Sequence, residues 1–205
     1  MKILAILAVS FFCGSLPIGV IVGKLTKGID IRDYGSGNIG ATNVLRTLGL
    51  GPAIVVSVGD TLKGFVPVFL AMRLISGSHQ ALFVVAAGLL AIVGHSASPF
   101  LKFKGGKGVA TSLGMIIGMN PVIAAIGFCI WAFIVAVTRY VSIASIIAPF
   151  AVTALMYFSP AVFGREVPRE YVIVTLAASF LILLRHRSNI KRLLKGTEPK
   201  IGQKA

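Results

Sequence analysis

Long runs of apolar residues dominate the sequence, and few soluble folds could bury so many of them. A helix that crosses the roughly 30 Å hydrocarbon core of a bilayer needs about 20 apolar residues, because it rises about 1.5 Å per residue. Five runs meet this requirement, at residues 3–23, 51–73, 80–101, 141–161 and 169–185. A sixth run, 109–138, is too long for one straight span and rather short for two. We therefore expect an all-α, polytopic membrane helical bundle.

The charge balance supports this fold class. The chain has 20 Lys and Arg residues against 6 Asp and Glu, and a net charge of +14 would by itself suggest a nucleic-acid partner. However, only 13% of its 205 residues are charged, whereas an ordinary soluble domain is about 25% charged. This balance excludes a disordered basic tail, a disulfide-rich scaffold and most soluble enzymes, and we expect no nucleic-acid partner. Cys13 and Cys129 lie in apolar runs, so we also expect no metal site.

The sixth run is expected to form two helices, because Asn120-Pro121 interrupts it and proline breaks or kinks a helix interior. Two crossings there would put 15 of the 20 basic residues on the side of the C-terminus, as the positive-inside rule favours. We predict seven spans in a single membrane domain over residues 1–205, with the N-terminus outside and the C-terminus cytoplasmic. The fourth span, near 109–119, would be too short to cross the full bilayer.

A polar loop rich in glycine follows the first span. Gly35, Gly37 and Gly40 match G-x-G-x-x-G, but no strand precedes them, which excludes a dinucleotide-binding fold. Glycines still allow backbone N–H groups to approach an anion, and Arg46 could hold a phosphate with two hydrogen bonds. The neutral donors in this loop are Ser36, Asn38, Thr42 and Asn43. The alternative is a polar turn that only connects two spans.

A second loop mixes glycines and lysines just before a helix expected to begin near Val109. Its core reads Lys104-Gly105-Gly106-Lys107-Gly108, which does not fit a Walker A loop. Helix N-termini bind phosphate through free N–H groups and the helix dipole. A cluster of basic residues whose only role is to stop transfer of the chain across the membrane would explain the lysines but not the glycines. We therefore interpret this loop as an anion-binding segment.

The last span continues into a basic segment, Arg185–Lys195, which Gly196 and Pro199 should terminate. His186 and Asn189 are three residues apart and share one helix face. Basic residues here could also lie on anionic lipid. The three polar segments fall on one predicted face of the membrane. Together they indicate a site for phosphate-bearing ligands that have an apolar part.

Several polar residues lie within or beside the spans. Asp60 and Lys63 are three residues apart in the second span, so they form either a structural ion pair or a support for a site residue. His95 ends the third span and could contact or cap the second loop. Ser142 opens the sixth span, where it could contact an anion or simply begin a helix at the lipid interface.

These segments resemble the bacterial acyl-phosphate:glycerol-3-phosphate acyltransferases, the PlsY family. The resemblance rests on Gly35-Ser-Gly-Asn-Ile-Gly-Ala-Thr-Asn43, Phe103-Lys-Gly-Gly-Lys-Gly-Val-Ala-Thr111 and Arg185-His-Arg-Ser-Asn-Ile-Lys-Arg-Leu193, with Gly196-Thr-Glu198 after them. It covers essentially the whole chain. It implies acyl transfer from acyl-phosphate to the 1-hydroxyl of glycerol 3-phosphate, the first step of phospholipid synthesis. It also implies the bacterial cytoplasmic membrane, a cytoplasmic site, no cofactor, and a partner enzyme that forms the acyl-phosphate.

The resemblance also implies residue roles. Basic residues and glycine N–H groups would neutralise two phosphates, while Ser36 and Asn189 would stabilise the developing oxyanion. His186 could be the base or could bind phosphate, and a substrate phosphate could instead accept the proton. Glu198 would tie the tail to a basic loop. The candidate catalytic residues are Ser36, Arg46, His186 and Asn189. The candidate substrate-binding residues are Gly35, Gly37, Asn38, Thr42, Asn43, His95, Lys104, Gly105, Gly106, Lys107, Gly108 and Ser142.

Two other classes of function fit part of the pattern. A transporter of phosphate or organic phosphate anions would explain the spans and the basic face, but it should place polar groups near the midplane, often in repeated halves. Only Asp60 and Lys63 provide midplane charge, and no internal repeat is visible. A non-catalytic membrane scaffold would bind anionic lipid with the same basic residues.

Overall fold

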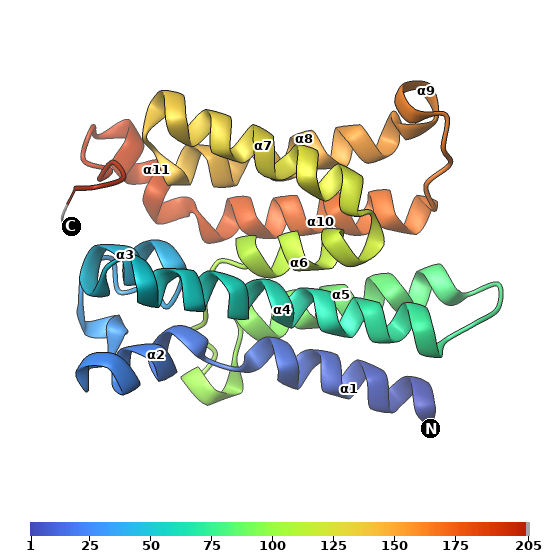
Figure 1. Cartoon of the computed structure of the whole chain (residues 1–205), viewed down its shortest axis with the longest axis horizontal. Coiled ribbons are helices and arrows are strands. Elements are labelled where there is room, and N and C mark those ends of the chain that lie inside the picture. The colour runs from blue at the N-terminus through green and yellow to red at the C-terminus, as the bar shows by residue number, and fades with distance from the viewer. Residues whose placement is uncertain (204–205) are drawn as a thin grey trace.

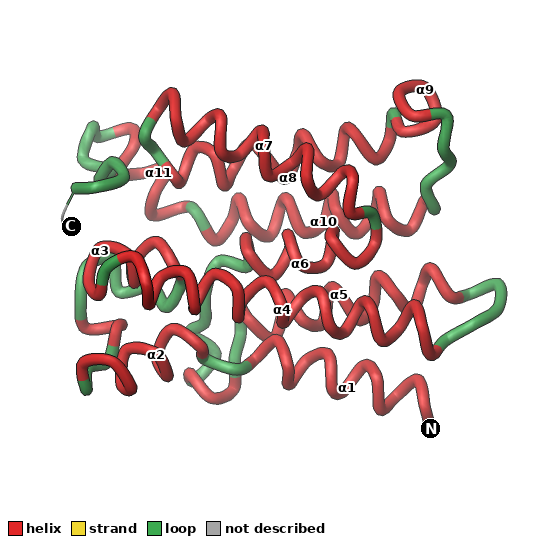
Figure 2. The backbone as a smooth tube through the Cα atoms, in the orientation of Figure 1, coloured by secondary structure: helices red, strands yellow, loops and turns green. Residues whose placement is uncertain are grey.

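The computed structural model describes residues 1–203 and shows helices packed side by side. In Figure 1, α1, α4, α5, α7, α8 and α10 run roughly along the long axis, and the N-terminus lies at the end of the molecule opposite to α11. Figure 2 shows helices joined by loops, with no strand in the part that is described. The helices are α1 (Lys2–Ser15), α2 (Ile18–Lys27), α3 (Ala41–Leu48), α4 (Leu50–Leu74), α5 (Gln80–Ser96), α6 (Val109–Met119), α7 (Pro121–Thr138), α8 (Val141–Tyr157), α9 (Ser159–Phe163), α10 (Arg169–Arg185) and α11 (Arg187–Leu194).

The predicted helical bundle is confirmed, together with several helices suited to a membrane. By length and hydropathy, α4, α7 and the segment Gln80–Leu101 could each cross a bilayer. The bent pairs α1–α2 and α10–α11 would raise the number to five if each pair is one span, while α6 and α8 are apolar but shorter. The count of seven spans and the orientation of the ends stay predictions.

The expected break at Asn120-Pro121 is confirmed, since α6 ends at Met119 and α7 begins at Pro121. The Asn120 side chain accepts a hydrogen bond from the backbone N–H of Ile123 at 3.1 Å and so caps α7. Proline is well suited to the first helical position, where its missing N–H costs nothing. The 11 residues of α6 make it a short helix, as predicted.

The first predicted span, residues 3–23, is wrong as a single straight helix. The chain forms α1 and α2 instead, and the two helices differ in direction by 41°. Pro17 lies at the break, and it lacks the N–H that would continue the hydrogen-bond ladder of α1. The second helix of this pair carries Lys24 and Lys27 in its last turn.

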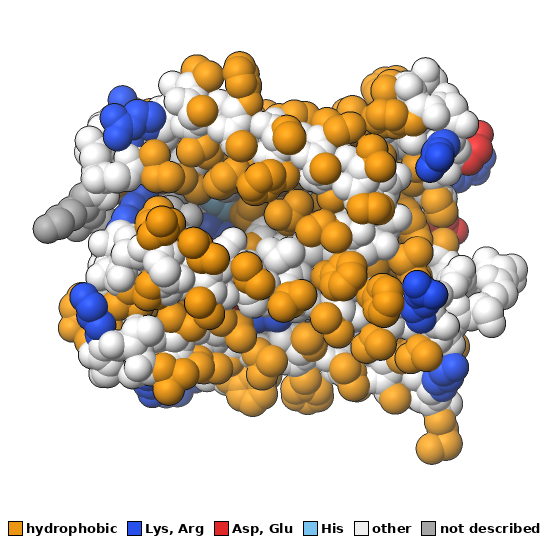
Figure 3. Space-filling view, in the orientation of Figure 1, with side chains coloured by type: hydrophobic (Ala, Val, Ile, Leu, Met, Phe, Trp, Pro, Cys, Tyr) orange, Lys and Arg blue, Asp and Glu red, His pale blue; other side chains and the backbone are white. Residues whose placement is uncertain are grey.

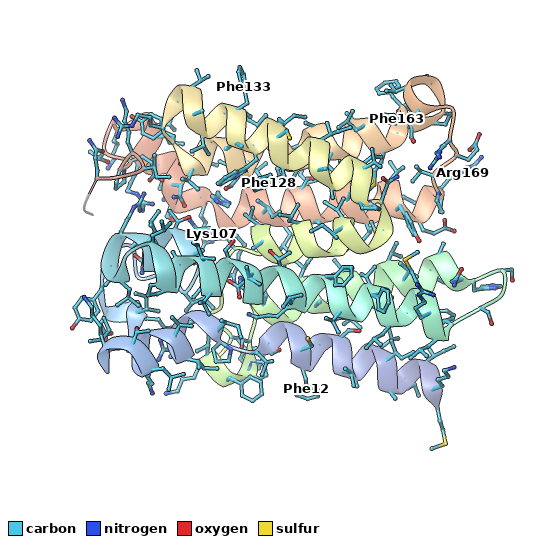
Figure 4. All side chains as sticks on the ribbon, viewed as in Figure 1. Phe12, Lys107, Phe128, Phe133, Phe163 and Arg169 are labelled. Atoms are coloured by element: carbon cyan, nitrogen blue, oxygen red, sulfur yellow. The ribbon has the colours of Figure 1, made fainter. Side chains whose placement is uncertain are left out.

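The surface is apolar around the middle of the molecule. Figure 3 shows hydrophobic side chains covering the central part of this face, with Lys and Arg gathered toward the two ends. Large exposed apolar residues include Phe12, Leu62, Phe133 and Phe180. Exposed apolar surface of this extent is expected of a protein that faces lipid. In Figure 4, Phe12 and Phe133 point away from the bundle.

Glycines allow α4 and α6 to pack closely. A side chain on Gly64 would collide with the carbonyl oxygen of Thr111, and one on Gly114 with that of Thr61. Small residues at such crossings are typical of helix packing in membranes. This packing fixes the start of α6, and therefore the second loop that precedes it, against α4.

Candidate active site

Asn43 on α3 organises the first glycine-rich loop. The two hydrogens of its side-chain nitrogen are shared among the carbonyl oxygens of Ile31, Tyr34 and Asn38, at 3.1, 3.0 and 2.9 Å. Its oxygen accepts from the backbone N–H of Ser36 at 2.8 Å. The side chain is buried, and both of its polar atoms are used inside the loop. Asn43 therefore shapes the loop that presents Ser36 and Asn38, rather than standing free for a ligand.

Two glycines give this loop its turns. Gly35 and Gly37 have φ angles of +56° and +69°, in the left-handed region that favours glycine. A side chain on Gly35 would also collide with the Asn43 oxygen. Gly35 and Gly37 lie outside the linings of the two cavities described below, so their contribution is to the path of the backbone.

The second glycine-rich loop lies against the end of α5. The N–H groups of Gly105 and Gly106 donate to the carbonyl oxygens of Ser96 and His95 at 3.2 and 3.0 Å. A side chain on Gly105 would collide with the His95 carbonyl oxygen, and one on Gly106 would collide with the His95 ring. The loop is therefore held flat on His95, and it delivers Lys107 to the start of α6.

Lys107 begins a chain of polar contacts that reaches the C-terminal segment. Its ammonium donates to the side-chain oxygen of Asn189 at 2.6 Å. The Asn189 amide and the Arg192 guanidinium then donate to the two carboxylate oxygens of Glu198, each at 2.7 Å. Glu198 thus joins the tail to α11. Burial alone would raise the pKa of Glu198, but the hydrogen bonds from Asn189 and Arg192 outweigh it and hold the pKa below its usual value.

His186 and Arg46 bring two more elements to the same place. His186 lies at the 56° bend between α10 and α11, and its Nδ1 is 2.8 Å from the carbonyl oxygen of Ile182. A carbonyl can only accept, so Nδ1 carries the hydrogen and Nε2 keeps its lone pair. Arg46 donates from Nη2 to the carbonyl oxygen of Pro199 at 3.0 Å, which ties α3 to the tail.

A cavity of about 260 Å³ joins these polar groups to an apolar interior. In Figure 3 this face is hollowed where basic side chains show between the lower helices and α7. Figure 4 places Lys107 between the α3–α4 side and the α10–α11 side of the bundle. The apolar part of the wall comes from α6, α7 and α8. Its members include Leu113, Ile116, Ala124, Phe128, Trp131 and Val152.

A second cavity of about 380 Å³ lies beside the first and is lined by polar and basic residues. It includes Gly105 and Gly106 together with Arg185, Arg187 and Arg192. The two cavities share three lining residues, which are Ser36, Asn38 and Lys107. The arrangement is a long apolar space that ends at a cationic junction, where a second, hydrophilic space opens.

The structure brings most of the predicted site residues together. The first cavity is lined by Ser36, Asn38, Thr42, Asn43, Arg46, His95, Lys107, Gly108, Ser142, His186 and Asn189. Lys104 is exposed and lies outside both linings. Sequence reasoning missed the apolar wall as part of the site, and it gave Glu198 a structural role without placing it at the cavity.

The two cavities have unused hydrogen-bonding capacity for an anion. Among the described residues, Arg46 Nε and Ser112 Oγ at the first cavity and Arg185 Nη2 at the second are buried without a hydrogen-bond partner. Buried polar atoms normally have partners, so a cluster of unpartnered ones marks a place where a polar ligand would be stabilised. Burial lowers the pKa of Arg46, yet an arginine keeps its charge at any physiological pH.

Burial of Lys107 predicts a pH dependence. Burial is the main cause that lowers its pKa from 10.5 to about 8. We expect kcat/KM to fall about 10-fold per pH unit above about pH 8, because this constant reports ionisations of the free enzyme. Between these two pKa values the unfolded chain binds more protons than the native one, so this group makes the fold more stable as pH rises. The expected fall in kcat/KM would therefore not be caused by unfolding that follows from loss of the Lys107 proton.

The measurement is a pH profile of kcat/KM between pH 7 and 10, with Lys107→Arg as the matched variant. Arginine stays charged across this range, so the variant should retain its remaining activity to higher pH. A wild-type profile that is flat up to pH 9.5 would contradict the assignment of Lys107 as the working cation.

The fold and site define a membrane-type helical bundle in which an apolar cavity meets a cationic junction, an arrangement suited to acylated anions. Comparison with known proteins identifies the group within this class. The family model described as "Glycerol-3-phosphate acyltransferase" matches residues 4–196, and the chain belongs to this family. The resemblance drawn from the three glycine-rich and basic segments is thereby confirmed.

Relatives and solved structures agree along the full length. The glycerol-3-phosphate acyltransferase of Gloeobacter violaceus is 47% identical over 98% of this chain and 96% of its own. The glycerol-3-phosphate acyltransferase of a Nostoc species is 45% identical over 98% of this chain and 92% of its own. The crystal structure of PlsY, an integral membrane glycerol 3-phosphate acyltransferase, in its glycerol 3-phosphate form is 36% identical, with a TM-score of 0.90 over 98% of this chain and 96% of that one. Its lysophosphatidic acid form gives a TM-score of 0.87.

Proposed function

We propose that this protein transfers a fatty acyl group from acyl-phosphate to the 1-hydroxyl of glycerol 3-phosphate, giving lysophosphatidate and inorganic phosphate. The observation that carries the proposal is the first cavity, whose wall changes from apolar residues on α6, α7 and α8 to Lys107 and its neighbours. An acyl chain fits the apolar part and a phosphate fits the cationic junction. The hydrophilic cavity beside it, with Arg185 and Arg192, suits glycerol 3-phosphate.

The chemistry needs little acid catalysis, because an acyl-phosphate is a mixed anhydride with a good leaving group. The hydroxyl oxygen attacks the acyl carbon, the carbon–oxygen bond to phosphate breaks, and phosphate leaves with the electron pair. Lys107 and Arg46 would hold the leaving phosphate, while Ser36 and Asn189 would donate to the carbonyl oxygen as it gains charge. The lone pair on His186 Nε2 is one acceptor for the hydroxyl proton, and a substrate phosphate is the other.

Acyl-phosphate suits the junction better than a coenzyme A thioester. In the described residues, the lining of the hydrophilic cavity is made of glycine, serine, asparagine, leucine and basic side chains, with no aromatic ring to stack on adenine. The donor would be supplied by an enzyme that forms acyl-phosphates. The test is to give purified protein glycerol 3-phosphate with hexadecanoyl-phosphate, hexadecanoyl-coenzyme A or hexadecanoyl-acyl carrier protein. Only the first should yield lysophosphatidate, and product from either thioester would overturn the assigned donor.

The length of the apolar cavity should set the acyl-chain preference. From Ser142 to Val152, both at the cavity wall, α8 rises about 15 Å at about 1.5 Å per residue. Ala124→Leu would add three carbon atoms to the wall and displace about two methylene groups of the acyl chain, each worth about 0.8 kcal/mol of burial. We expect kcat/KM for hexadecanoyl-phosphate to fall about 10-fold more than that for octanoyl-phosphate. Ala125→Leu, on the exposed side of α7, is the control. Equal losses for both donors in Ala124→Leu would refute the assignment.

We further propose seven crossings in one membrane domain, with the N-terminus outside and the site on the cytoplasmic face. The proposal is supported by the N-terminus and α11, which lie at opposite ends of the molecule, and by α3, which lies at the same end as α11 (Figure 1). Each test protein carries one new cysteine after Cys13 and Cys129 become alanine. A cysteine at exposed Ser78 should react with an impermeant maleimide on intact cells, and one at exposed Lys195 should not. The reverse pattern would contradict this orientation.

A further inference from the structure

Three ionisable side chains meet beneath the second glycine-rich loop. Asp60 and Lys63 lie one turn apart on α4, with Lys63 Nζ 2.6 Å from Asp60 Oδ1. His95, at the end of α5, has its Nδ1 3.4 Å from Lys63 Nζ and 3.7 Å from Asp60 Oδ1. All three are buried, with exposed fractions of 2–4%. A charged pair in such a place is costly unless it has a structural or functional partner.

The contacts fix the protonation of His95. The Lys63 ammonium is only a donor and lies 3.4 Å from the ring nitrogen Nδ1, whereas the Asp60 carboxylate oxygen is 3.7 Å away and beyond hydrogen-bond distance, so we assign Nδ1 as the acceptor from Lys63. A hydrogen on Nδ1 would point at a positive charge 3.4 Å away. The imidazole is therefore neutral and carries its hydrogen on Nε2. Asp60 neutralises Lys63, so the three groups together carry no net charge.

The opposite edge of the His95 ring faces the second glycine-rich loop. A side chain on Gly106 would meet the ring at Nε2, so this nitrogen lies directly against the loop that delivers Lys107. The ring lines the first cavity together with Lys107 and Asp60. Within residues 1–203 no protein group accepts a hydrogen bond from Nε2. His95 is therefore a neutral hydrogen-bond donor through Nε2, and the Asp60–Lys63 ion pair contacts the other side of its ring.

We propose that His95 donates its Nε2 hydrogen to a phosphate oxygen of a bound substrate, and that Asp60 and Lys63 are positioning residues that hold it as this tautomer. The inference rests on the proposed function, because the phosphate is that of glycerol 3-phosphate or of acyl-phosphate. Asp60 and Lys63 act only through the ring, so their effect on substrate should depend on the presence of histidine at this position.

The first test compares two replacements of His95. The terminal amide nitrogen of glutamine reaches about as far as Nε2 of histidine, whereas that of asparagine stops short. His95→Asn should weaken binding of one phosphate substrate about 10- to 100-fold, as expected for a lost hydrogen bond to a charged group. His95→Gln should cost less than about 3-fold. The readouts are the Kd for glycerol 3-phosphate without donor and the KM for acyl-phosphate. The constant that changes identifies which phosphate His95 contacts.

The second test separates positioning from structural support. Lys63→Met alone leaves a buried carboxylate unpaired and should destabilise the fold, so the double variant Asp60→Leu, Lys63→Met is used instead. A neutral apolar pair often matches a buried ion pair in stability. We expect its melting temperature to stay near that of the wild type, while the same substrate constant rises about 3- to 10-fold. In a His95→Gln background the double substitution should change that constant less than about 2-fold, because coupled residues are not additive.

The control for loss of a buried polar contact is Ser179→Ala, which removes a 3.3 Å hydrogen bond to Thr153; neither of these two residues belongs to the lining of either cavity. It should leave both constants within about 2-fold. Equal effects of the double substitution in both backgrounds, or normal binding by His95→Asn, would overturn the proposal. A wild-type protein that binds glycerol 3-phosphate through His95 but yields no lysophosphatidate would instead reject the proposed function alone.

Discussion

Replacing Lys107 with methionine should lower kcat/KM by about 100- to 1,000-fold, the cost of removing one preorganised donor from a site that develops negative charge. Lys107 is the only lysine in the linings of both cavities as described, and it contacts Asn189 at 2.6 Å. Methionine keeps the unbranched shape of the side chain, one atom shorter, and removes the charge. The variant should therefore fold while losing its hold on phosphate. The measurement is the initial rate of lysophosphatidate formation over a range of both substrates.

The control is Lys102→Met, five residues away on the exposed side of the same loop. It should reduce kcat/KM less than about 3-fold, since exposed charges are screened by water. If both variants lose activity to the same extent, the effect belongs to the general positive charge of this face and not to a phosphate site at Lys107.

Gly105→Ala should reduce kcat/KM by about 100-fold, which makes it the second large effect. The added carbon would collide with the carbonyl oxygen of His95, a backbone atom that cannot turn away. The loop must then shift, and a displacement of about 1 Å at a reacting centre can cost about 100-fold in rate. The melting temperature should fall by only a few degrees, because the loop contributes little to the packed core.

Gly51→Ala is the matched control for this change. Gly51 lies in the first turn of α4, has an ordinary φ angle, and has no atom within 4 Å of the added carbon. Alanine favours a helix more than glycine does, so activity should be unchanged and stability equal or slightly higher. A Gly105→Ala protein with wild-type kinetics would show that the loop does not need to lie against His95.

The helices could be predicted from the sequence because their signal is local and repeated. A run of about 20 apolar residues is sufficient to indicate α4, and the proline after Asn120 marks the break between α6 and α7. The bend at Pro17 was missed because apolar residues continue on both sides of it, and a sum of hydropathy does not register one missing N–H. For the same reason, a sum of hydropathy does not show which helices are long enough to cross a bilayer.

The site could be predicted in part, for a related reason. Glycines beside lysines and asparagines indicated the two loops that border the cavities, and the lining of the first cavity includes Lys107 and Asn189. Which of Lys104 and Lys107 lines the cavities depends on the turn at Lys102 and Phe103, whose φ angles are +51° and +62°. That turn leaves Lys104 outside. The apolar wall has no local signature, since its members come from three helices that meet only in the folded chain.

We propose that acyl-phosphate and glycerol 3-phosphate react at the junction of the two cavities. The most direct measurement is the product balance of the purified protein supplied with these two substrates alone, following lysophosphatidate and inorganic phosphate together. We predict one molecule of each product per turnover, with both lost together in Lys107→Met. Phosphate released without lysophosphatidate, or no product from a protein that binds both substrates, would contradict the account.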